Sequence, residues 1–258
     1  MVDTSLKCPS LPAIRELVDL CRSYFFPQFY GVEGIPCDDT ERKLQRIRTL
    51  LLMNADADTV ERFVEALPEI KSLLKEDAEA AYDGDPAAES IDEVVLCYPT
   101  MKALSNYRVA HCLYRLGVPL VPRVITEMAH SETGIDIHPG AQIGHRFTID
   151  HGTGVVIGET TDIGDHVKIY QGVTLGALST RKGQLLSGKK RHPTLGDYVT
   201  VYSNASILGG ETVIGSGAVI SGSAFVCESV PQNARVILNQ ETIVHKPDDA
   251  EPAWCYVI

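Results

Sequence analysis

The chain lacks the features of a secreted, membrane-spanning or nucleic-acid-binding protein. No uninterrupted apolar run approaches the ~18 residues of a membrane span, and the N-terminus lacks the basic-then-apolar layout of a signal peptide. Basic residues are few, 23 against 34 acidic ones, and the net charge of −11 argues against a polyanionic partner. The seven cysteines are odd in number and include no C-x-x-C pair. We therefore expect no disulfide framework or structural zinc, but reduced thiols in a cytoplasm.

The composition is that of a globular protein, with 44% hydrophobic and 22% charged residues among 258. Up to about residue 132 the sequence predicts helices, because apolar residues recur at three- and four-residue spacings over 11–26, 40–53 and 59–75. Pro86 and Pro99 suit the first turns of two further helices, the second ending at Gly117, and 121–129 completes the set. The first half is therefore expected to be a helical bundle.

After Gly134 the aliphatic period becomes six, which neither a helix nor an ordinary strand produces. The residues at this spacing form three runs: Ile137, Ile143, Ile149 and Val155; Ile157, Ile163, Ile169 and Leu175, after a two-residue slip; and Leu195, Val201, Ile207, Val213, Val219 and Phe225. Hexapeptide repeats build a parallel β-helix, in which each unit is one short strand and a turn, with the aliphatic side chain inside the prism. Residues 177–192 interrupt the repeat, and we expect them to form an extruded loop with five basic residues and no acidic one.

Four motifs then appear in order: D-I-H-P at 136–139, D-H-G-T-G at 150–154, G-E-T at 158–160 and R-H-P at 191–193. Together with the helical first half and the terminal isoleucine, they resemble serine O-acetyltransferase, of the hexapeptide-repeat, left-handed β-helix acyltransferase superfamily. The resemblance implies an α+β chain: an α-helical oligomerisation domain at 1–133, a left-handed β-helix catalytic domain at 134–239 with the loop 177–192, and a flexible tail at 240–258. The left hand rests on the resemblance alone, because ordinary parallel crossovers are right-handed.

The resemblance also implies a role for each motif. His151 matches the general base that takes the proton of the serine hydroxyl, and Asp136 matches the carboxylate that orients it. Asp85 and Asp150 match acidic groups that hold the amino acid, while Arg191 and His192 match the groups that bind its carboxylate. The chemistry asks for such a set, because a serine hydroxyl needs a base near neutral pH and a zwitterion needs charges of both signs. Asp85 could instead cap a helix that begins at Pro86.

The implied co-substrate is acetyl-CoA, with no metal, since a thioester is already activated. Small residues at Ala205 and Gly222 are candidates for its pantetheine arm, and Lys189 and Lys190 for its phosphates. In the family the site lies between adjacent subunits of a trimer, which in some members pairs into a hexamer. Cysteine inhibits by feedback from the serine pocket. The terminal isoleucine, Ile258 here, enters O-acetylserine sulfhydrylase.

Three other functions stay open at this point. One is a hexapeptide O-acetyltransferase that acts on a sugar or antibiotic hydroxyl. Another is a γ-type carbonic anhydrase, for which His145, His151 and His166 are the nearest set of zinc ligands. The last is a non-catalytic scaffold. The sequence departs from many family members in two places: the helix beginning P-T-M-K at 99 lacks a Pro-Gly start with a nearby histidine, and the extruded loop is longer than the short glycine-rich version.

Overall fold

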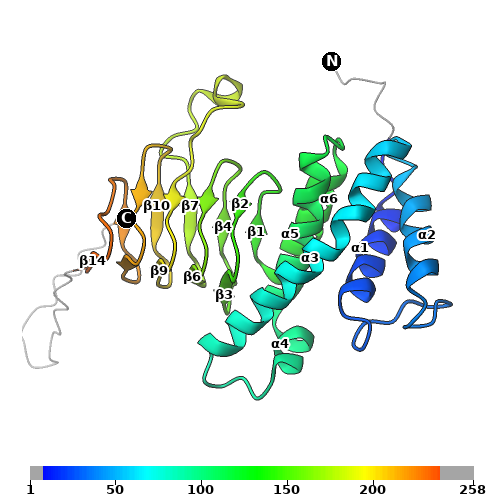
Figure 1. Ribbon diagram of the computed structural model, residues 1–258. Helices are drawn as coiled ribbons and strands as arrows, with labels where there is room; N and C mark the ends of the chain where they lie inside the picture. Colours follow the sequence, from blue (N-terminus) through cyan, green and yellow to red (C-terminus); the bar gives the residue numbers. More distant parts are fainter. Residues whose placement is uncertain (1–7, 239–258) are drawn as a thin grey trace, which may run out of the picture.

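A computed structural model describes residues 8–238. Helices occupy one end of an elongated molecule and a parallel β-prism the other, with one loop projecting from the prism (Figure 1). The helices are α1 (Leu11–Phe25), α2 (Thr40–Leu51), α3 (Ala57–Gly84), α4 (Ile91–Cys97), α5 (Pro99–Arg115) and α6 (Val121–Thr133). No described helix is long and apolar enough to cross a membrane.

Side-chain caps fix where four of these helices begin. Ser10, Asp39, Asp56 and Ser90 each accept a hydrogen bond from the backbone N–H three residues on, which satisfies one of the free donors of the first turn. The expectation that Pro86 opens a helix is wrong, because α4 starts at Ile91 behind the Ser90 cap. Helix α3 also runs well past residue 75 and carries Pro68 within it.

The prism has three faces of parallel strands, each pairing with the strand one coil away. Face 1 holds β1 (Asp136–Ile137), β4 (Val156–Ile157), β7 (Thr174–Gly176), β10 (Ser206–Leu208) and β13 (Phe225–Val226). Face 2 holds β2 (Gln142–Ile143), β5 (Asp162–Ile163), β8 (Thr194–Leu195) and β11 (Val213–Ile214). Face 3 holds β3 (Thr148–Asp150), β6 (Lys168–Tyr170), β9 (Thr200–Val201), β12 (Val219–Ile220) and β14 (Arg235–Val236). The predicted β-helix is confirmed.

The hexapeptide phase is correct for most coils and wrong for the last ones. Ile157, Ile169 and Leu175 are buried in the prism, as the spacing predicts. Val213 and Phe225, however, are 46% and 68% exposed, and the interior positions belong to a series one residue later: Ile214, Ile220 and Val226. An extra residue at the Gly209–Gly210 corner causes the shift, since Ile207 and Ile214 lie seven apart.

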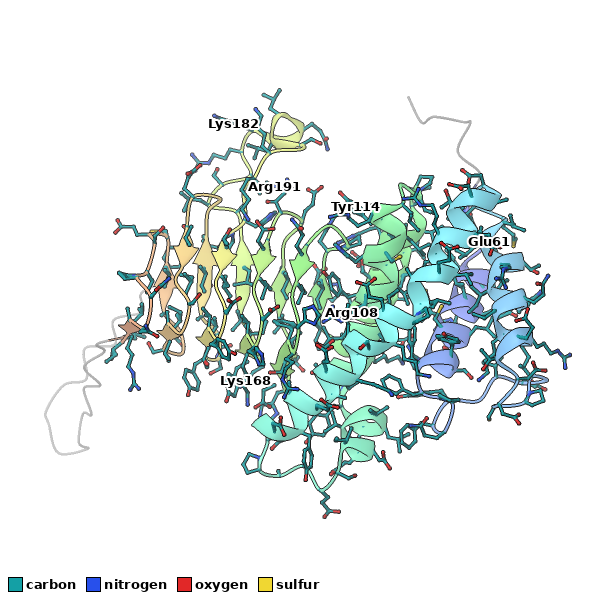
Figure 2. The ribbon with its side chains drawn as sticks, viewed as in Figure 1. Glu61, Arg108, Tyr114, Lys168, Lys182 and Arg191 are labelled. Atoms are coloured by element: carbon teal, nitrogen blue, oxygen red, sulfur yellow. The ribbon has the colours of Figure 1, made fainter. Side chains whose placement is uncertain are left out.

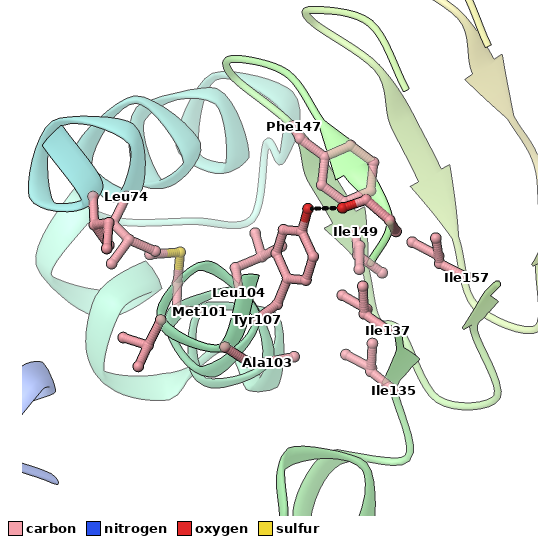
Figure 3. Close-up of a cluster of buried hydrophobic side chains, with 14 of the residues drawn as sticks. Leu74, Met101, Ala103, Leu104, Tyr107, Ile135, Ile137, Phe147, Ile149 and Ile157 are labelled. Carbon is pink, nitrogen blue, oxygen red and sulfur yellow. Dashed lines mark hydrogen bonds between the residues drawn. The ribbon is translucent and has the colours of Figure 1, made fainter. Parts of the chain in front are cut away.

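The helices and the prism share one buried core. Tyr107 of α5 reaches the first coil, where its hydroxyl donates to the Ala141 carbonyl at 2.6 Å, between Phe147 and Ile137 (Figure 3). Arg108, also on α5, forms a buried ion pair with Asp77 of α3, with Nε and Oδ2 2.7 Å apart. The end of α3 is thereby fixed against the first coils.

Candidate active site

The predicted base lies on an irregular corner of the prism. Asp150 aligns with Tyr170, and Val156 aligns with Thr174, in the ladders of faces 3 and 1. Five residues (151–155) therefore span the first corner between these faces, whereas three (171–173) span the next. The two extra residues are the slip seen in the hexapeptide period. They place His151 in the left-handed region, at φ 59°, with its side chain 74% exposed at the prism edge.

Gly152 makes this corner possible. Its φ is +91°, and a Cβ there would lie 2.5 Å from Cδ1 of Ile135, a buried side chain of the coil below. Any side chain would be strained and would also clash. The glycine after His151 in D-H-G-T-G is therefore a requirement of the turn that exposes the imidazole.

A cluster of charged groups surrounds His151; we call this the His151 edge, formed by Asp85, Tyr98, Asp150, His151 and Lys168. Nε2 of His151 lies 3.6 Å from Oδ1 of Asp150, and Lys168 Nζ lies 3.1 Å from the other Asp150 oxygen. Lys168 also donates to the Gly84 carbonyl at the end of α3, at 2.8 Å. Helix α3 thus brings Asp85 to the prism beside Asp150.

Asp85 does not cap a helix at Pro86, although it accepts a hydrogen bond from the Ala87 N–H at 2.8 Å. Its second oxygen accepts from the Tyr98 hydroxyl. These two hydrogen bonds, with the positive charge of Lys168, hold the pKa of Asp85 below its ordinary value. The hydrogen bond that Tyr98 donates to Asp85 raises the pKa of the Tyr98 hydroxyl to about 12. The His151 edge therefore presents carboxylates to a cationic group.

Arg191 and His192 lie on a different edge, between faces 1 and 2, where the extruded loop leaves the prism; we call this the Arg191 edge. Arg191 ion-pairs with Glu159 of the G-E-T motif. Although burial opposes it, this guanidinium holds the pKa of Glu159 below its ordinary value. Arg191, Glu159 and loop residues line a cavity of about 280 Å³. Lys168 and Arg191 lie on opposite sides of the prism (Figure 2).

His192 is held in one tautomer. Its Nδ1 lies 3.0 Å from the Thr160 backbone N–H, which can only donate, so Nδ1 is an acceptor and Nε2 carries the proton. The ring lies close against Gly158, where a Cβ would be 2.1 Å from the nearest atom of the ring. Burial, reinforced by the Arg191 charge, lowers the pKa of His192 to about 4. His192 is therefore a neutral donor at neutral pH.

Asp136 does not contact His151 in this chain. It lies on the outward side of β1, one coil below Val156, where its ion-pair partner is Arg123 at 3.7 Å. The first coil thus places Asp136 beside the edge that carries His151, but turned toward α6. The structure brings Asp85, Asp150 and His151 together and leaves Arg191 and His192 apart from them.

The candidate cofactor residues differ in accessibility. Gly222 lies at the same edge as His151, in a close approach to the Ser203 carbonyl, which an added Cβ would meet at 3.1 Å. Ala205 is fully buried, and its carbonyl accepts from the Thr174 N–H. Its contact with a ligand stays a prediction. Lys189 is exposed. Lys190 instead anchors the base of the loop, with Nζ 2.6 Å from both Asp162 Oδ2 and the Thr160 carbonyl.

The three histidines of the carbonic anhydrase hypothesis do not meet. His145 pairs with Glu76 at 2.8 Å and His166 stacks on Tyr198, both at the edge between faces 2 and 3, away from His151. Within residues 8–238, the group of metal-ligand type is Glu127, His130 and Asp136, whose donor atoms lie within 4.8 Å of one another. Arg123 already ion-pairs with both carboxylates there.

Sequence reasoning missed Lys168, Tyr98 and Glu159. Lys168 could have been found from the coil length, because residues one coil apart lie beside each other on the same face. Lys168 aligns with Thr148, 20 residues earlier, and Thr148 is two residues before Asp150 on the same strand. Tyr98 could not be found this way, because its contact with Asp85 depends on how α3 and α4 pack. Glu159 lies inside a motif that was noticed but given no role.

Comparison with known proteins points to the same family as the motifs. No family model matches the chain. The plasmid serine acetyltransferase of Synechococcus elongatus is 54% identical over 178 residues, which cover 68% of this chain and 56% of that relative. The serine acetyltransferase of Bacillus licheniformis is 46% identical over 165 residues, covering 64% of this chain and 73% of the relative. The chain belongs to the serine acetyltransferase family.

Solved structures of serine acetyltransferases share the fold. Serine acetyltransferase 1 of Entamoeba histolytica, in complex with L-cysteine, superposes with a TM-score of 0.78 at 38% identity, covering 90% of this chain and 88% of that one. The Neisseria gonorrhoeae serine acetyltransferase, in complex with serine, gives 0.65 at 29% identity, covering 90% and 83%. The expected family, fold and acyltransferase class are confirmed.

Proposed function

We propose that this chain transfers the acetyl group of acetyl-CoA to the hydroxyl of L-serine, giving O-acetyl-L-serine and CoA, the first step of cysteine synthesis from serine. The observation that carries the proposal is the His151 edge. There, an exposed imidazole stands on a corner insertion beside two carboxylates, Asp85 and Asp150. The reaction class follows from the family to which the chain belongs, the serine acetyltransferases.

His151 acts as the general base. The hydroxyl loses its proton to the imidazole as its oxygen attacks the thioester carbonyl, and the protonated imidazole then returns the proton to the leaving thiolate. We assign to Asp136 the role of orienting the ring. It flanks the same edge, and the role requires its carboxylate to turn from Arg123, its ion-pair partner in this structure, toward the imidazole. Because a thioester is already activated, the reaction requires neither a metal nor a covalent enzyme intermediate.

The two edges hold opposite ends of the amino acid. Asp85 and Asp150 accept hydrogen bonds from the ammonium group. Arg191 and the Nε2–H of His192 donate hydrogen bonds to the carboxylate of the amino acid. For this, the Arg191 guanidinium exchanges its ion pair with Glu159 for one with the substrate. His192 fits this role because its lowered pKa keeps one fixed donor across the neutral range.

The distance between the edges requires a second copy of the chain. One coil is 18 residues long from Val156 to Thr174, so each of the three faces carries 18/3, or 6, residues. At ~3.3 Å per residue a face is on the order of 20 Å wide, which serine cannot span. The face between the edges exposes apolar Val156 and Phe225, 38% and 68% accessible, as expected of a surface that packs against another copy. We propose a homotrimer, alone or paired as a hexamer, in which the His151 edge of one subunit meets the Arg191 edge of the next.

Acetyl-CoA then lies along the His151 edge, past Gly222, where Lys189 of the neighbouring subunit's extruded loop is available to its phosphates. Residues 134–239 form the catalytic β-helix in this proposal, residues 1–133 the helical oligomerisation domain, and the reaction takes place in the cytoplasm. L-cysteine presents the same ammonium and carboxylate as serine and inhibits from the same site. The cysteine complex of the Entamoeba relative supports this part.

The tail extends the proposal to a partner. Ile258 lies outside the described residues, and its role rests on sequence: the polar segment D-D-A-E-P precedes the apolar residues Tyr256, Val257 and Ile258. We propose that Ile258 enters the active site of O-acetylserine sulfhydrylase, as the family resemblance implies.

The test is a thiol-release assay with acetyl-CoA against serine, homoserine and a galactoside. We expect serine to be preferred and cysteine to compete with it. Preference for the galactoside would replace the proposal with a sugar acetyltransferase. Stoichiometric zinc by metal analysis, together with CO₂ hydration and no thiol release, would replace it with a carbonic anhydrase.

A further inference from the structure

Two tyrosines stack on the outside of the prism, in successive coils. Strand β6 pairs with β9 through Lys168–Thr200 and Ile169–Val201, so Tyr170 and Tyr202 occupy the same position one coil apart. Their ring centroids lie 5.0 Å apart with 18° between the ring planes. Tyr202 is 44% exposed. We call this pair the tyrosine shelf.

The shelf continues the ladder that carries the His151 edge. Asp150 lies one coil below Tyr170 and aligns with it, and His151 directly follows Asp150 in the chain. Lys168 Nζ lies 4.8 Å from the centroid of the Tyr170 ring, which closes the lower end of the stack with a cation–π contact. The lower end of the shelf is thus fixed by the same lysine that holds Asp150.

Within residues 8–238, no further aromatic ring stacks on the upper end, above Tyr202. The Tyr202 N–H donates to the Ile220 carbonyl, and Ile220 aligns with Val201, so the position above Tyr202 belongs to Ser221. A serine side chain cannot cover a phenol ring. The next stacking position is therefore available to another planar ring, at the ~4.8 Å spacing of parallel strands.

From Asp150 to this open position there are three coil steps, or about 14 Å along the prism axis. A ligand that places a thioester at His151 and a planar ring above Tyr202 must therefore have a flexible arm between the two. Acetyl-CoA has this design, with adenine at the far end of the pantetheine arm. Stacking on aromatic side chains is the usual way that proteins hold a base without reading its edges.

We propose that Tyr202, supported by Tyr170, is the platform on which the adenine of the acetyl donor stacks. The proposal rests on the proposed function, because it takes acetyl-CoA as donor. It adds a residue, Tyr202, that makes the protein prefer acetyl-CoA to thioesters without an adenine. It also means that the two tyrosines contact the acetyl donor and not the amino acid.

The experiment compares two donors: acetyl-CoA and S-acetylpantetheine, which lacks the adenine nucleotide. In Tyr202→Ala we expect KM for acetyl-CoA to rise roughly 5- to 100-fold, the range for loss of one base–aromatic stack, with KM for serine unchanged. With S-acetylpantetheine, kcat/KM should equal that of the wild type. Tyr202→Phe keeps the ring and should restore KM for acetyl-CoA.

Tyr198→Ala is the matched control. Tyr198 is also exposed and also stacked, with its ring 4.5 Å from that of His166, but it lies on the edge between faces 2 and 3. This variant should leave both donors unaffected. If Tyr202→Ala lowers kcat/KM equally for both donors and reduces the mass in solution, the shelf contacts a second copy and the proposal is overturned.

Binding of adenosine 3′,5′-bisphosphate gives a readout independent of acetyl transfer. Tyr202→Ala should weaken this binding and Tyr198→Ala should not. If the wild-type chain transfers no acetyl group to serine but shows this difference, the proposed acceptor is wrong and the shelf stands. Equal binding by both variants and the wild type would remove Tyr202 from the donor site.

Discussion

The two-edge site predicts that two inactive variants restore each other. His151→Ala removes the base from one edge, and Arg191→Ala removes the carboxylate-binding group from the other. In a cyclic oligomer each site takes one edge from a subunit and the other edge from its neighbour. A mixed oligomer therefore contains some sites in which both edges are wild type, although no single chain is.

The expected magnitude follows from counting. In a random mixture with fraction x of the His151→Ala chain, a site is intact when its His151 edge comes from the Arg191→Ala chain and its Arg191 edge from the His151→Ala chain. That probability is x(1 − x), so equal mixing restores about one quarter of wild-type activity. Alone, His151→Ala should retain roughly 10⁻² to 10⁻⁴ of wild-type turnover. Arg191→Ala should retain roughly a tenth or less at low serine, since hydrogen bonds to charged groups contribute about 1.5–3 kcal/mol.

The assay is thiol release at a serine concentration below the wild-type KM, on oligomers co-expressed at known ratios and purified over one tag that both chains carry, so that mixed oligomers are not selected. Activity against x should follow a parabola with its maximum at equal mixing. The matched control combines His151→Ala with Asp150→Asn, two changes on the same edge, which cannot produce an intact site. A straight line between the two single-variant activities would refute the two-edge site and return catalysis to one chain.

Three further predictions concern single residues. His151→Ala lowers kcat roughly 10²–10⁴-fold while circular dichroism shows an unchanged fold; near-normal turnover would remove His151 from the mechanism. Arg191→Ala raises KM for serine far more than KM for acetyl-CoA and weakens inhibition by cysteine in parallel, as initial rates over both substrates will show. A change confined to acetyl-CoA would move Arg191 to the donor site. Deletion of Ile258 leaves acetyl transfer intact but abolishes inhibition of O-acetylserine sulfhydrylase in a titration, and equal inhibition by the full-length and truncated chains would contradict its role.

The repeat made the β-helix predictable, because a period of six has one structural explanation, and the two-residue slip marked an irregular corner. What the period could not show is which side chain the irregular corner projects, or that a second insertion follows later in the chain. The slip falls at residues 151–155, where it projects His151, and the later one-residue insertion at Gly209–Gly210 turns Phe225 from the interior to the surface. Insertions at corners cost little in a prism whose strands stay paired, so hydrophobic spacing constrains them weakly.

The site residues were predictable only where a motif carried them. His192 came from R-H-P, but its tautomer is set by Thr160 of the preceding coil, and its pKa is lowered by burial. Lys168 came from no motif and holds Asp150. Contacts between coils 18 or 20 residues apart, and contacts of a helix with a coil, depend on register and packing that a linear pattern does not contain.

In the proposed site, Asp85 makes the helical half part of the site as well as of the fold. Asp85 follows the last residue of α3, and contacts along that helix fix it on the prism: Asp77 accepts from the Phe147 N–H at 3.1 Å, and the Gly84 carbonyl accepts from Lys168 at 2.8 Å. Arg108 of α5 pairs with Asp77 and also donates to the Gly144 carbonyl of the prism at 3.1 Å. The Asp77–Arg108 pair is buried, and loss of one partner from such a pair costs about 3–5 kcal/mol. The division of the chain near residue 134 separates helices from strands, and in the proposed site residues from both sides of it bind the amino acid. An unrelated oligomerisation module in place of the helices would leave the His151 edge without one of its two carboxylates.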